Sequence, residues 1–146
     1  MSPLSIRSGF IDHLGIELLR AEAGTSELRL VLAPEHLNSW EVMHGGVTMA
    51  LLDVALSTAC RSVAPAGTGV VTIEMKTSFM QPGTGEMRAL GRLLHRSTTM
   101  AYCEGEVRDS SGKLVAKAMG TFKYLRRLAV GREIKEQRRP GEVRGD

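Results

Sequence analysis

The sequence is poor in aromatic residues and has no long apolar run, and each shortage excludes a class of protein. Three Phe, two Tyr and one Trp among 146 residues provide no stacking platform for nucleic-acid bases. No segment reaches the ~18 consecutive apolar residues that a membrane-spanning helix requires. The N-terminal stretch MSPLSIRSGFIDHLGIELL has no continuous apolar core, so we do not expect a secretion signal. We therefore expect a cytoplasmic protein with no membrane partner.

Cysteine is also scarce, and the potential metal ligands are scattered. Cys60 and Cys103 lie in apolar segments without CxxC spacing, which is typical of buried, reduced thiols in an intracellular protein. The sequence contains neither a P-loop nor a GxGxxG motif. We predict no metal site and no cofactor, because the histidines lie in four separate segments: His13, His36, His44 and His95.

Charge is distributed unevenly along the chain. Residues 126–146 hold seven Lys or Arg and four Asp or Glu, whereas the preceding 125 residues hold twelve of each sign. A neutral body argues against nucleic-acid binding, although a local basic patch for a phosphorylated small molecule stays open. We predict one domain over residues 1–125 and a flexible basic tail over 126–146. We expect the tail to be solvated, and frayed helix or disordered beyond about Leu128.

The hydrophobic pattern predicts an α+β protein. A short amphipathic helix is expected over Pro3–Ile11 and a hairpin over residues 15–33. Residues 45–63 lack strand alternation and are rich in Ala, Leu and Met, which favours a helix of about five turns. Four strand-like runs follow, separated by turn signals: residues 70–80, 87–95, 99–109 and 114–125. One long helix and about six strands indicate a sheet wrapped around the helix.

Asp53 is the single charged residue between Val47 and Ala59, in the middle of the long helix. Because this helix is apolar nearly all round, we expect Asp53 to be buried, where an unpartnered carboxylate is costly. Two interpretations remain open. Asp53 is either a structural acid bonded to a neighbouring donor, or a base or nucleophile held ready by its environment.

The same helix opens with the sequence His44-Gly45-Gly46. A helix start offers free N–H groups and a partial positive charge, which can polarise a carbonyl oxygen that becomes negative during acyl transfer. A turn with a capping residue explains the same triplet without any ligand. Asn38, in the preceding loop, either orients an acyl group or a water, or simply forms a turn.

If Gly45 and Asp53 are both catalytic, their spacing predicts a homodimer. Gly45 and Asp53 are eight residues apart on one helix, which corresponds to about 12 Å of rise. One small reacting group cannot touch both in the same chain. Antiparallel pairing of two such helices would bring Gly45 of each chain near Asp53 of the other, giving two sites at the interface.

Together, Asn38, the His44-Gly45 pair and Asp53 resemble the active-site signature of hotdog-fold acyl-CoA thioesterases, closest to the phenylacetate-degradation branch. The stretch VVTIEMKTSFMQPG (70–83) resembles that family as well, and the likeness covers about residues 10–125. It implies a hotdog fold, in which an antiparallel sheet of about six strands wraps a long central helix, in dimers that often pair into tetramers. It also implies hydrolysis of an aryl or medium-chain acyl-CoA to free acid and CoA, with CoA entering as part of the substrate.

The resemblance also implies a role for each residue. The backbone N–H of Gly45 should polarise the thioester carbonyl, and Asp53 of the partner subunit should attack as nucleophile or activate a water. Asn38 should position the water or the carbonyl, and His44 should hold the loop or the thioester end. Thr72 stands where this branch often places a serine or threonine beside the attacking water.

Thr72 poses a question of orientation. It shares strand parity with Glu74 and Lys76, so its face should be the polar one. Either that face lines the ligand groove, or a bulge turns Thr72 to the other side.

Residues for the CoA moiety are predicted at a link between strands. His95, Arg96 and Ser97 occupy this link, and we expect Arg96 to contact a phosphate unless it is a plain exposed arginine. Gly46 at the helix start completes the predicted CoA-binding set. Lys76 and Lys123 are weaker candidates.

The acyl pocket is expected to be lined by the helix and its partner, including Met43, Val47 and Met49, whose flexible methionines permit loose specificity. Trp40 either shapes this pocket or anchors its loop.

Two other functions remain open: a hydratase or dehydratase of acyl thioesters, and a non-catalytic acyl-CoA sensor.

Overall fold

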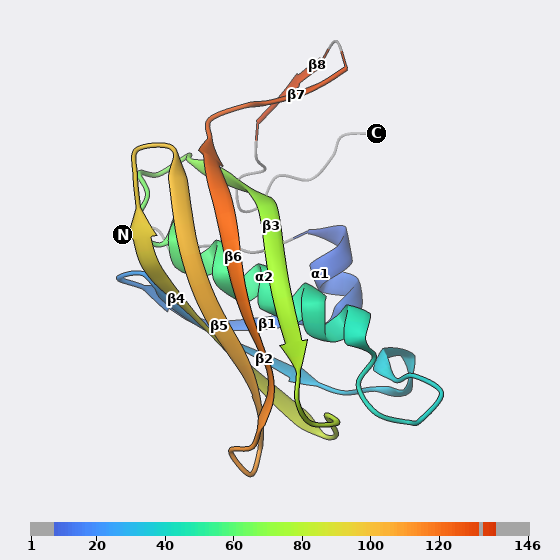
Figure 1. The fold of residues 1–146 in the computed structure, drawn as a ribbon. Coiled ribbons are helices and arrows are strands. Elements are labelled where there is room, and N and C mark those ends of the chain that lie inside the picture. The colour runs from blue at the N-terminus through green and yellow to red at the C-terminus, as the bar shows by residue number, and fades with distance from the viewer. Residues whose placement is uncertain (1–7, 132, 137–146) are drawn as a thin grey trace.

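The computed structural model describes residues 8–131 and 133–136, which form one long helix wrapped by a six-stranded antiparallel sheet (Figure 1). A short helix precedes this unit and a small hairpin follows it. Within the described residues, no helix is both long and apolar enough to cross a membrane. The elements are α1 (Gly9–Leu14), β1 (Glu17–Glu22), β2 (Thr25–Val31), η1 (Pro34–His36), α2 (Gly45–Arg61), β3 (Gly69–Phe79), β4 (Glu86–Arg96), β5 (Met100–Asp109), β6 (Leu114–Leu125), β7 (Leu128–Val130) and β8 (Glu133–Lys135).

The predicted hairpin, long helix and four strands are all confirmed. The structure begins the long helix at Gly45, as predicted, and ends it at Arg61. The first helix is displaced from its predicted position, because Ser8 caps its start and Gly15, with φ of 77°, ends it. Residues 3–7 of the predicted helix lie outside the described part of the chain.

The sheet has the strand order β1-β2-β4-β5-β6-β3. The chain leaves β2, passes through α2, and returns at the opposite edge of the sheet as β3 (Figure 1). Within the described chain, β3 pairs with β6 alone, so its second edge is open. This open edge runs beside α2, where the candidate functional residues lie.

Glycines on the central strands let α2 approach the sheet closely. Gly91 on β4 pairs with Gly105 on β5. A Cβ atom at Gly91 would lie 2.4 Å from the carbonyl oxygen of Ala55 on α2. At the same place the Ser26 hydroxyl donates a hydrogen bond of 2.6 Å to that oxygen. These contacts fix the position of the helix over the sheet.

The expectation for the start of the tail is wrong. Instead of frayed helix or disorder, residues 128–130 and 133–135 form the antiparallel hairpin β7–β8, which projects from the end of β6 (Figure 1). Gly131, with φ of 63°, follows β7. Residues 132 and 137–146 of the predicted tail lie outside the described part of the chain.

Replacing Gly91 by alanine should destabilise the protein, because the new methyl group would overlap backbone atoms of α2. We expect a loss of about 1–3 kcal/mol in the free energy of unfolding, measured by urea denaturation. Gly9→Ala is the matched control, since a Cβ at Gly9 meets nothing within 4 Å. Equal stability of the two variants would contradict the close approach.

Candidate active site

His44 caps the start of α2 with its own side chain. Its Nδ1 atom accepts a hydrogen bond of 2.9 Å from the Gly46 N–H. Nδ1 therefore carries no proton, and a neutral ring holds its hydrogen on Nε2. A Cβ at Gly46 would lie 3.1 Å from the same Nδ1. The cap therefore accounts for the glycine at position 46 and occupies its N–H.

Gly45 differs from Gly46 both in the hydrogen bonding of its N–H and in the packing around it. Its N–H donates to no acceptor within residues 8–131 and 133–136. A Cβ at Gly45 would lie 3.4 Å from the Phe79 ring, which is an ordinary packing distance. Packing within the chain therefore does not require glycine here. The Gly45 N–H is a donor at the positive end of α2 that is available to a ligand.

The loop before α2 is held by Asn38. The side-chain Oδ1 atom accepts hydrogen bonds from the N–H groups of Trp40 at 2.9 Å and Val42 at 3.3 Å. The turn interpretation of Asn38 is thus confirmed for its side-chain oxygen. Trp40 is 83% exposed, so it does not anchor this loop by packing within the chain.

A pocket of about 290 Å³ opens beside the start of α2. Met43 lines it, as predicted, whereas Val47 belongs to the buried core and Met49 is exposed. The pocket is lined by the Asn38 loop, the helix start and the segment that follows β3. Its lining residues are Asn38, Met43, Gly45, Thr48, Phe79, Met80, Gln81, Pro82, Gly83 and Val115.

The Thr72 hydroxyl donates a hydrogen bond of 2.6 Å to Asp53 Oδ1. A β-bulge makes this possible, because the register of β3 against β6 shifts between Thr72 and Glu74. Thr72 consequently pairs with the buried Phe122 and faces α2, whereas the Glu74 carboxylate bonds to Thr121. The bulge alternative for Thr72 is confirmed.

Asp53 is not fully buried within the chain, contrary to prediction. It is half-buried, because the sheet covers only one face of α2 and Asp53 lies at the margin of that face. Asp53 is also not partnerless, since Thr72 is its hydrogen-bond donor. A half-buried carboxylate that carries a donor hydroxyl can orient and deprotonate a water molecule.

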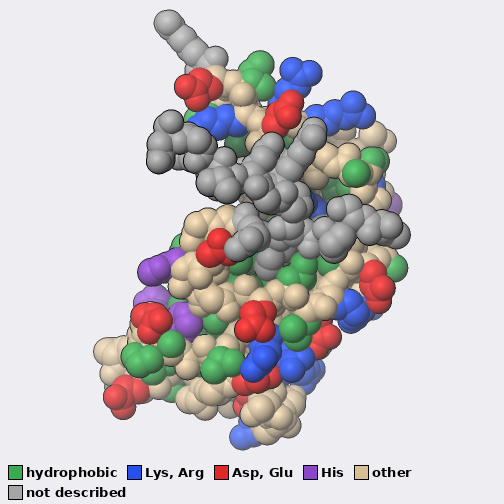
Figure 2. Space-filling model, turned by 180° about the vertical axis from the view of Figure 1, so that it is seen from behind, with side chains coloured by type: hydrophobic (Ala, Val, Ile, Leu, Met, Phe, Trp, Pro, Cys, Tyr) green, Lys and Arg blue, Asp and Glu red, His purple; other side chains and the backbone are tan. Residues whose placement is uncertain are grey.

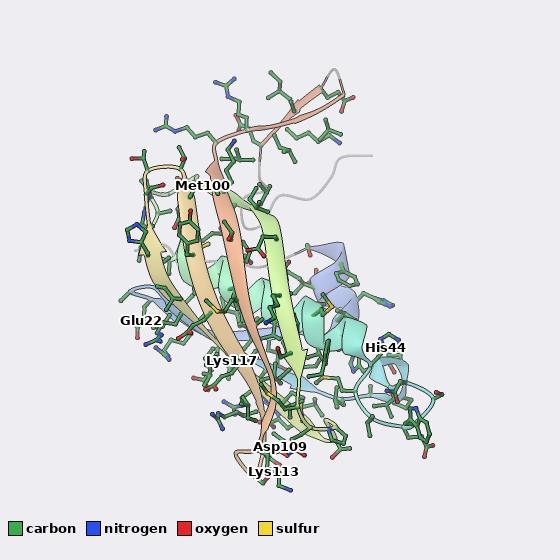
Figure 3. All side chains as sticks on the ribbon, viewed as in Figure 1. Glu22, His44, Met100, Asp109, Lys113 and Lys117 are labelled. Atoms are coloured by element: carbon green, nitrogen blue, oxygen red, sulfur yellow. The ribbon has the colours of Figure 1, made fainter. Side chains whose placement is uncertain are left out.

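Asp53 and Gly45 lie beside opposite ends of β3. Asp53 bonds to Thr72 near the start of this strand, and Gly45 lies against Phe79 at its end. Figure 3 shows His44, which precedes Gly45, at one end of α2. A single chain therefore does not place Gly45 and Asp53 around one small group.

The predicted CoA-binding link lies at the end of β4. The Arg96 guanidinium lies 4.5 Å from the centroid of the Tyr124 ring, and its Nη1 donates a hydrogen bond of 3.1 Å to the Val63 carbonyl. His95 stacks on Tyr102. The Ser97 hydroxyl accepts from the N–H groups of the following turn. Arg96 is thus held in place rather than being a plain exposed arginine.

The cysteines are free and buried, as predicted. The hydrogen bond with Cys60, together with burial, raises the pKa of the Cys103 thiol, which therefore stays protonated. A buried, protonated thiol is a poor nucleophile. Among the described residues, no three His, Cys, Asp or Glu side chains gather into a possible metal site.

Comparison with known proteins identifies the family. The model of the thioesterase superfamily matches residues 41–116, which include the start of α2, Asp53 and Thr72. The chain belongs to this superfamily. Membership identifies it as a hydrolase that acts on thioesters, and the predicted hotdog fold is confirmed.

Solved structures of this fold resemble the chain closely. The conserved protein PA5202 of Pseudomonas aeruginosa is 35% identical, with a TM-score of 0.79 over 82% of this chain and 96% of that one. BH2602 of Bacillus halodurans, solved with CoA, is 31% identical, with a TM-score of 0.77 over 83% and 81%. PaaI of Escherichia coli, from the phenylacetic acid degradation operon, is 22% identical, with a TM-score of 0.75 over 81% and 85%.

Sequence reasoning missed two residues of the candidate site. Phe79 lines the pocket and contacts Gly45, but its orientation depends on the bulge that precedes it. His36 is buried and connects the loop to the helix. Its Nδ1 accepts from the Ala33 N–H, and its carbonyl oxygen accepts from the His44 N–H. Only the proximity of His36 to the HGG segment could have drawn attention to it.

Replacing His44 by alanine should weaken the start of α2, because the Gly46 N–H loses its acceptor. We expect a cost of about 0.5–2 kcal/mol in the free energy of unfolding. His44→Asn is the control, since an asparagine side chain can supply the same cap. An alanine variant as stable as the asparagine variant in urea denaturation would show that the cap is unimportant.

Proposed function

We propose that this protein hydrolyses acyl-CoA thioesters to free acid and CoA. The proposal rests above all on one observation: Asp53, held by Thr72, and the available Gly45 N–H lie on the same helix but at separate positions. A base or nucleophile and an oxyanion donor are the two groups that acyl transfer to water requires. The likeness to BH2602, solved with CoA, supports CoA as the thiol portion of the substrate.

We infer that the active unit is a homodimer. Among the described residues, no strand pairs with the second edge of β3, and an exposed edge of this kind is a template for strand pairing. Exposed apolar side chains accompany this edge and the adjoining side of α2. These residues are Met49, Ile73, Phe79 and Met80. A two-fold pairing of β3 with the same strand of a second chain would cover them.

Antiparallel pairing of the two β3 strands would also complete the site. It brings the Phe79 end of one strand beside the Thr72 end of the other. Gly45 of one chain then faces Asp53 of the partner subunit, and the same happens again across the two-fold axis. The half-exposed Asp53 carboxylate becomes covered at the interface. Two such dimers can pair further into a tetramer.

In the proposed reaction, water replaces the CoA thiolate on the acyl carbon. The Gly45 N–H stabilises the negative charge that develops on the carbonyl oxygen. Asp53 either removes a proton from the attacking water or attacks the carbonyl itself, forming an anhydride that water then cleaves. Thr72 holds the carboxylate in position. The thiolate leaves readily, so the site needs no strong general acid.

The acyl group is proposed to occupy the pocket beside the start of α2. The Phe79 ring and the Met43 and Met80 side chains offer apolar surface to an aryl or medium-chain acyl group. Asn38 reaches the same pocket, and its side-chain NH₂ group is suited to donate to the thioester carbonyl or the water.

Replacing Asp53 by asparagine should abolish most thiol release from acyl-CoA while leaving the fold intact. We expect turnover to fall by at least about a hundredfold, because a general base of this kind contributes 10²–10⁴ in rate. The assay follows free thiol from a panel of aryl and aliphatic acyl-CoAs. Thermal unfolding of both proteins serves as the folding control.

The same panel separates the alternatives. An Asp53→Asn variant with near-native turnover would refute the assigned role of Asp53. Binding of acyl-CoA by the native protein without thiol release would favour a sensor. Addition of water to an unsaturated acyl chain without thiol release would favour a hydratase.

Mixing two inactive variants tests the shared site. Gly45→Pro, which removes the N–H at the first position of α2, and Asp53→Asn each damage both sites of their own homodimer. A mixed dimer, however, keeps one site with native Gly45 and native Asp53. After unfolding and refolding together, about a quarter of native activity should return, because about half of the dimers are mixed and each retains one of two sites.

The control mixture pairs Asp53→Asn with Thr72→Val. These two residues lie in the same half of the site, so every site in the mixed dimer carries one defect. No activity should return. Restoration in neither mixture would place the complete site within one chain.

A further inference from the structure

A second pocket, of about 160 Å³, lies between the start of β3 and the β7–β8 hairpin. Its walls combine apolar side chains from β3 and β6 with cations from the segment that enters the hairpin. The lining residues are Gly69, Val70, Val71, Leu125, Arg126, Arg127, Leu128, Lys135 and Glu136. Neither the thioester chemistry nor the acyl pocket makes use of this space.

The positively charged side chains around this pocket form few ion pairs with the described part of the chain. Arg126 and Arg127 are exposed, and neither forms an ion pair with a residue in the described part of the chain. Lys135 lies 3.8 Å from Glu133 in an exposed ion pair, which binds weakly in water. Figure 2 shows Lys and Arg side chains at the end of the molecule that carries the hairpin, with Asp or Glu side chains among them. This surface is therefore suited to an anion.

The pocket adjoins the reacting groups. Val71, in its wall, directly precedes Thr72, whose hydroxyl bonds to Asp53. Val70 pairs with Tyr124, and the Arg96 guanidinium lies over the Tyr124 ring. A molecule with its thioester at Asp53 can thus extend along the start of β3 towards the hairpin.

We propose that the β7–β8 hairpin and the residues that enter it bind the phosphorylated nucleotide of CoA, a proposal that rests on the acyl-CoA function above. The 3′-phosphate and the diphosphate would face Arg126, Arg127 and Lys135. Guanidinium groups bind phosphate oxygens through paired, charge-assisted hydrogen bonds. The apolar walls formed by Val71 and Leu128 accept the flat adenine ring. The described part of the basic tail, residues 126–131 and 133–136, then contributes to the substrate site.

The test uses adenosine 3′,5′-bisphosphate, a nucleotide fragment of CoA without the thioester. We expect Arg126→Gln combined with Arg127→Gln to weaken its binding at least about tenfold in isothermal titration calorimetry, the equivalent of ~1.4 kcal/mol. The control is Lys113→Gln combined with Lys117→Gln, which removes the same charge at the opposite end of the sheet (Figure 3). The control pair should bind nearly as the native protein does.

Kinetics provide the second readout. The arginine pair should raise KM for acyl-CoA and leave kcat unchanged, while hydrolysis of the matching acyl-pantetheine, which lacks the nucleotide, should be unaffected. Equal loss of bisphosphate binding in both variant pairs, or an equal loss of activity towards both substrates, would overturn the proposal. Failure of the thioesterase function is distinguishable, because the native protein would then release no thiol from either substrate.

Discussion

The close approach of α2 to the central strands is the constraint on which the rest of the structure depends. Where Gly91 faces the Ala55 carbonyl, no side chain separates helix from sheet, and Ser26 bonds to that carbonyl from β2. A helix held this tightly cannot rotate or slide. Its start must point towards the end of β3, and Asp53 must lie at the margin that β3 borders. The positions of the candidate residues are therefore set by a packing contact that includes none of them.

The second determining feature is that a single chain does not bring the Gly45 N–H and the Asp53 carboxylate together. α2 carries an available N–H at its start and a carboxylate two turns later, while no other strand of the described chain pairs with the second edge of β3 beside it. Both features would find partners in the proposed two-fold arrangement. Strand pairing would supply the missing hydrogen bonds of the edge, and it would bring the helix start of one chain to the carboxylate of the other. Assembly and catalysis would then depend on one surface, so a change in either affects both.

The regular helix and strands bring the candidate residues into one region, and local irregularities then set the directions of their polar groups. The bulge after Thr72 turns its hydroxyl from the outer face of the sheet to α2. The His44 cap occupies one of two adjacent N–H groups and leaves the other available. The β7–β8 hairpin adds cations beside the strand that carries Thr72. Each device involves one or a few residues, and each decides where a polar group points.

The sequence by itself determined the elements and most of the candidate residues. Apolar periodicity distinguishes the helix that begins at Gly45 from the strands around it, and the lone charge of Asp53 stands out in an apolar segment whatever the fold. Orientation was decided only by tertiary structure. The side-chain period of a strand cannot reveal a bulge, so the direction of Thr72 remained open. The apolar surface of α2 could not show that the sheet leaves Asp53 half-exposed, or that a polar tail segment forms a hairpin beside β3. Such features depend on contacts between residues far apart in the chain, which local patterns do not encode.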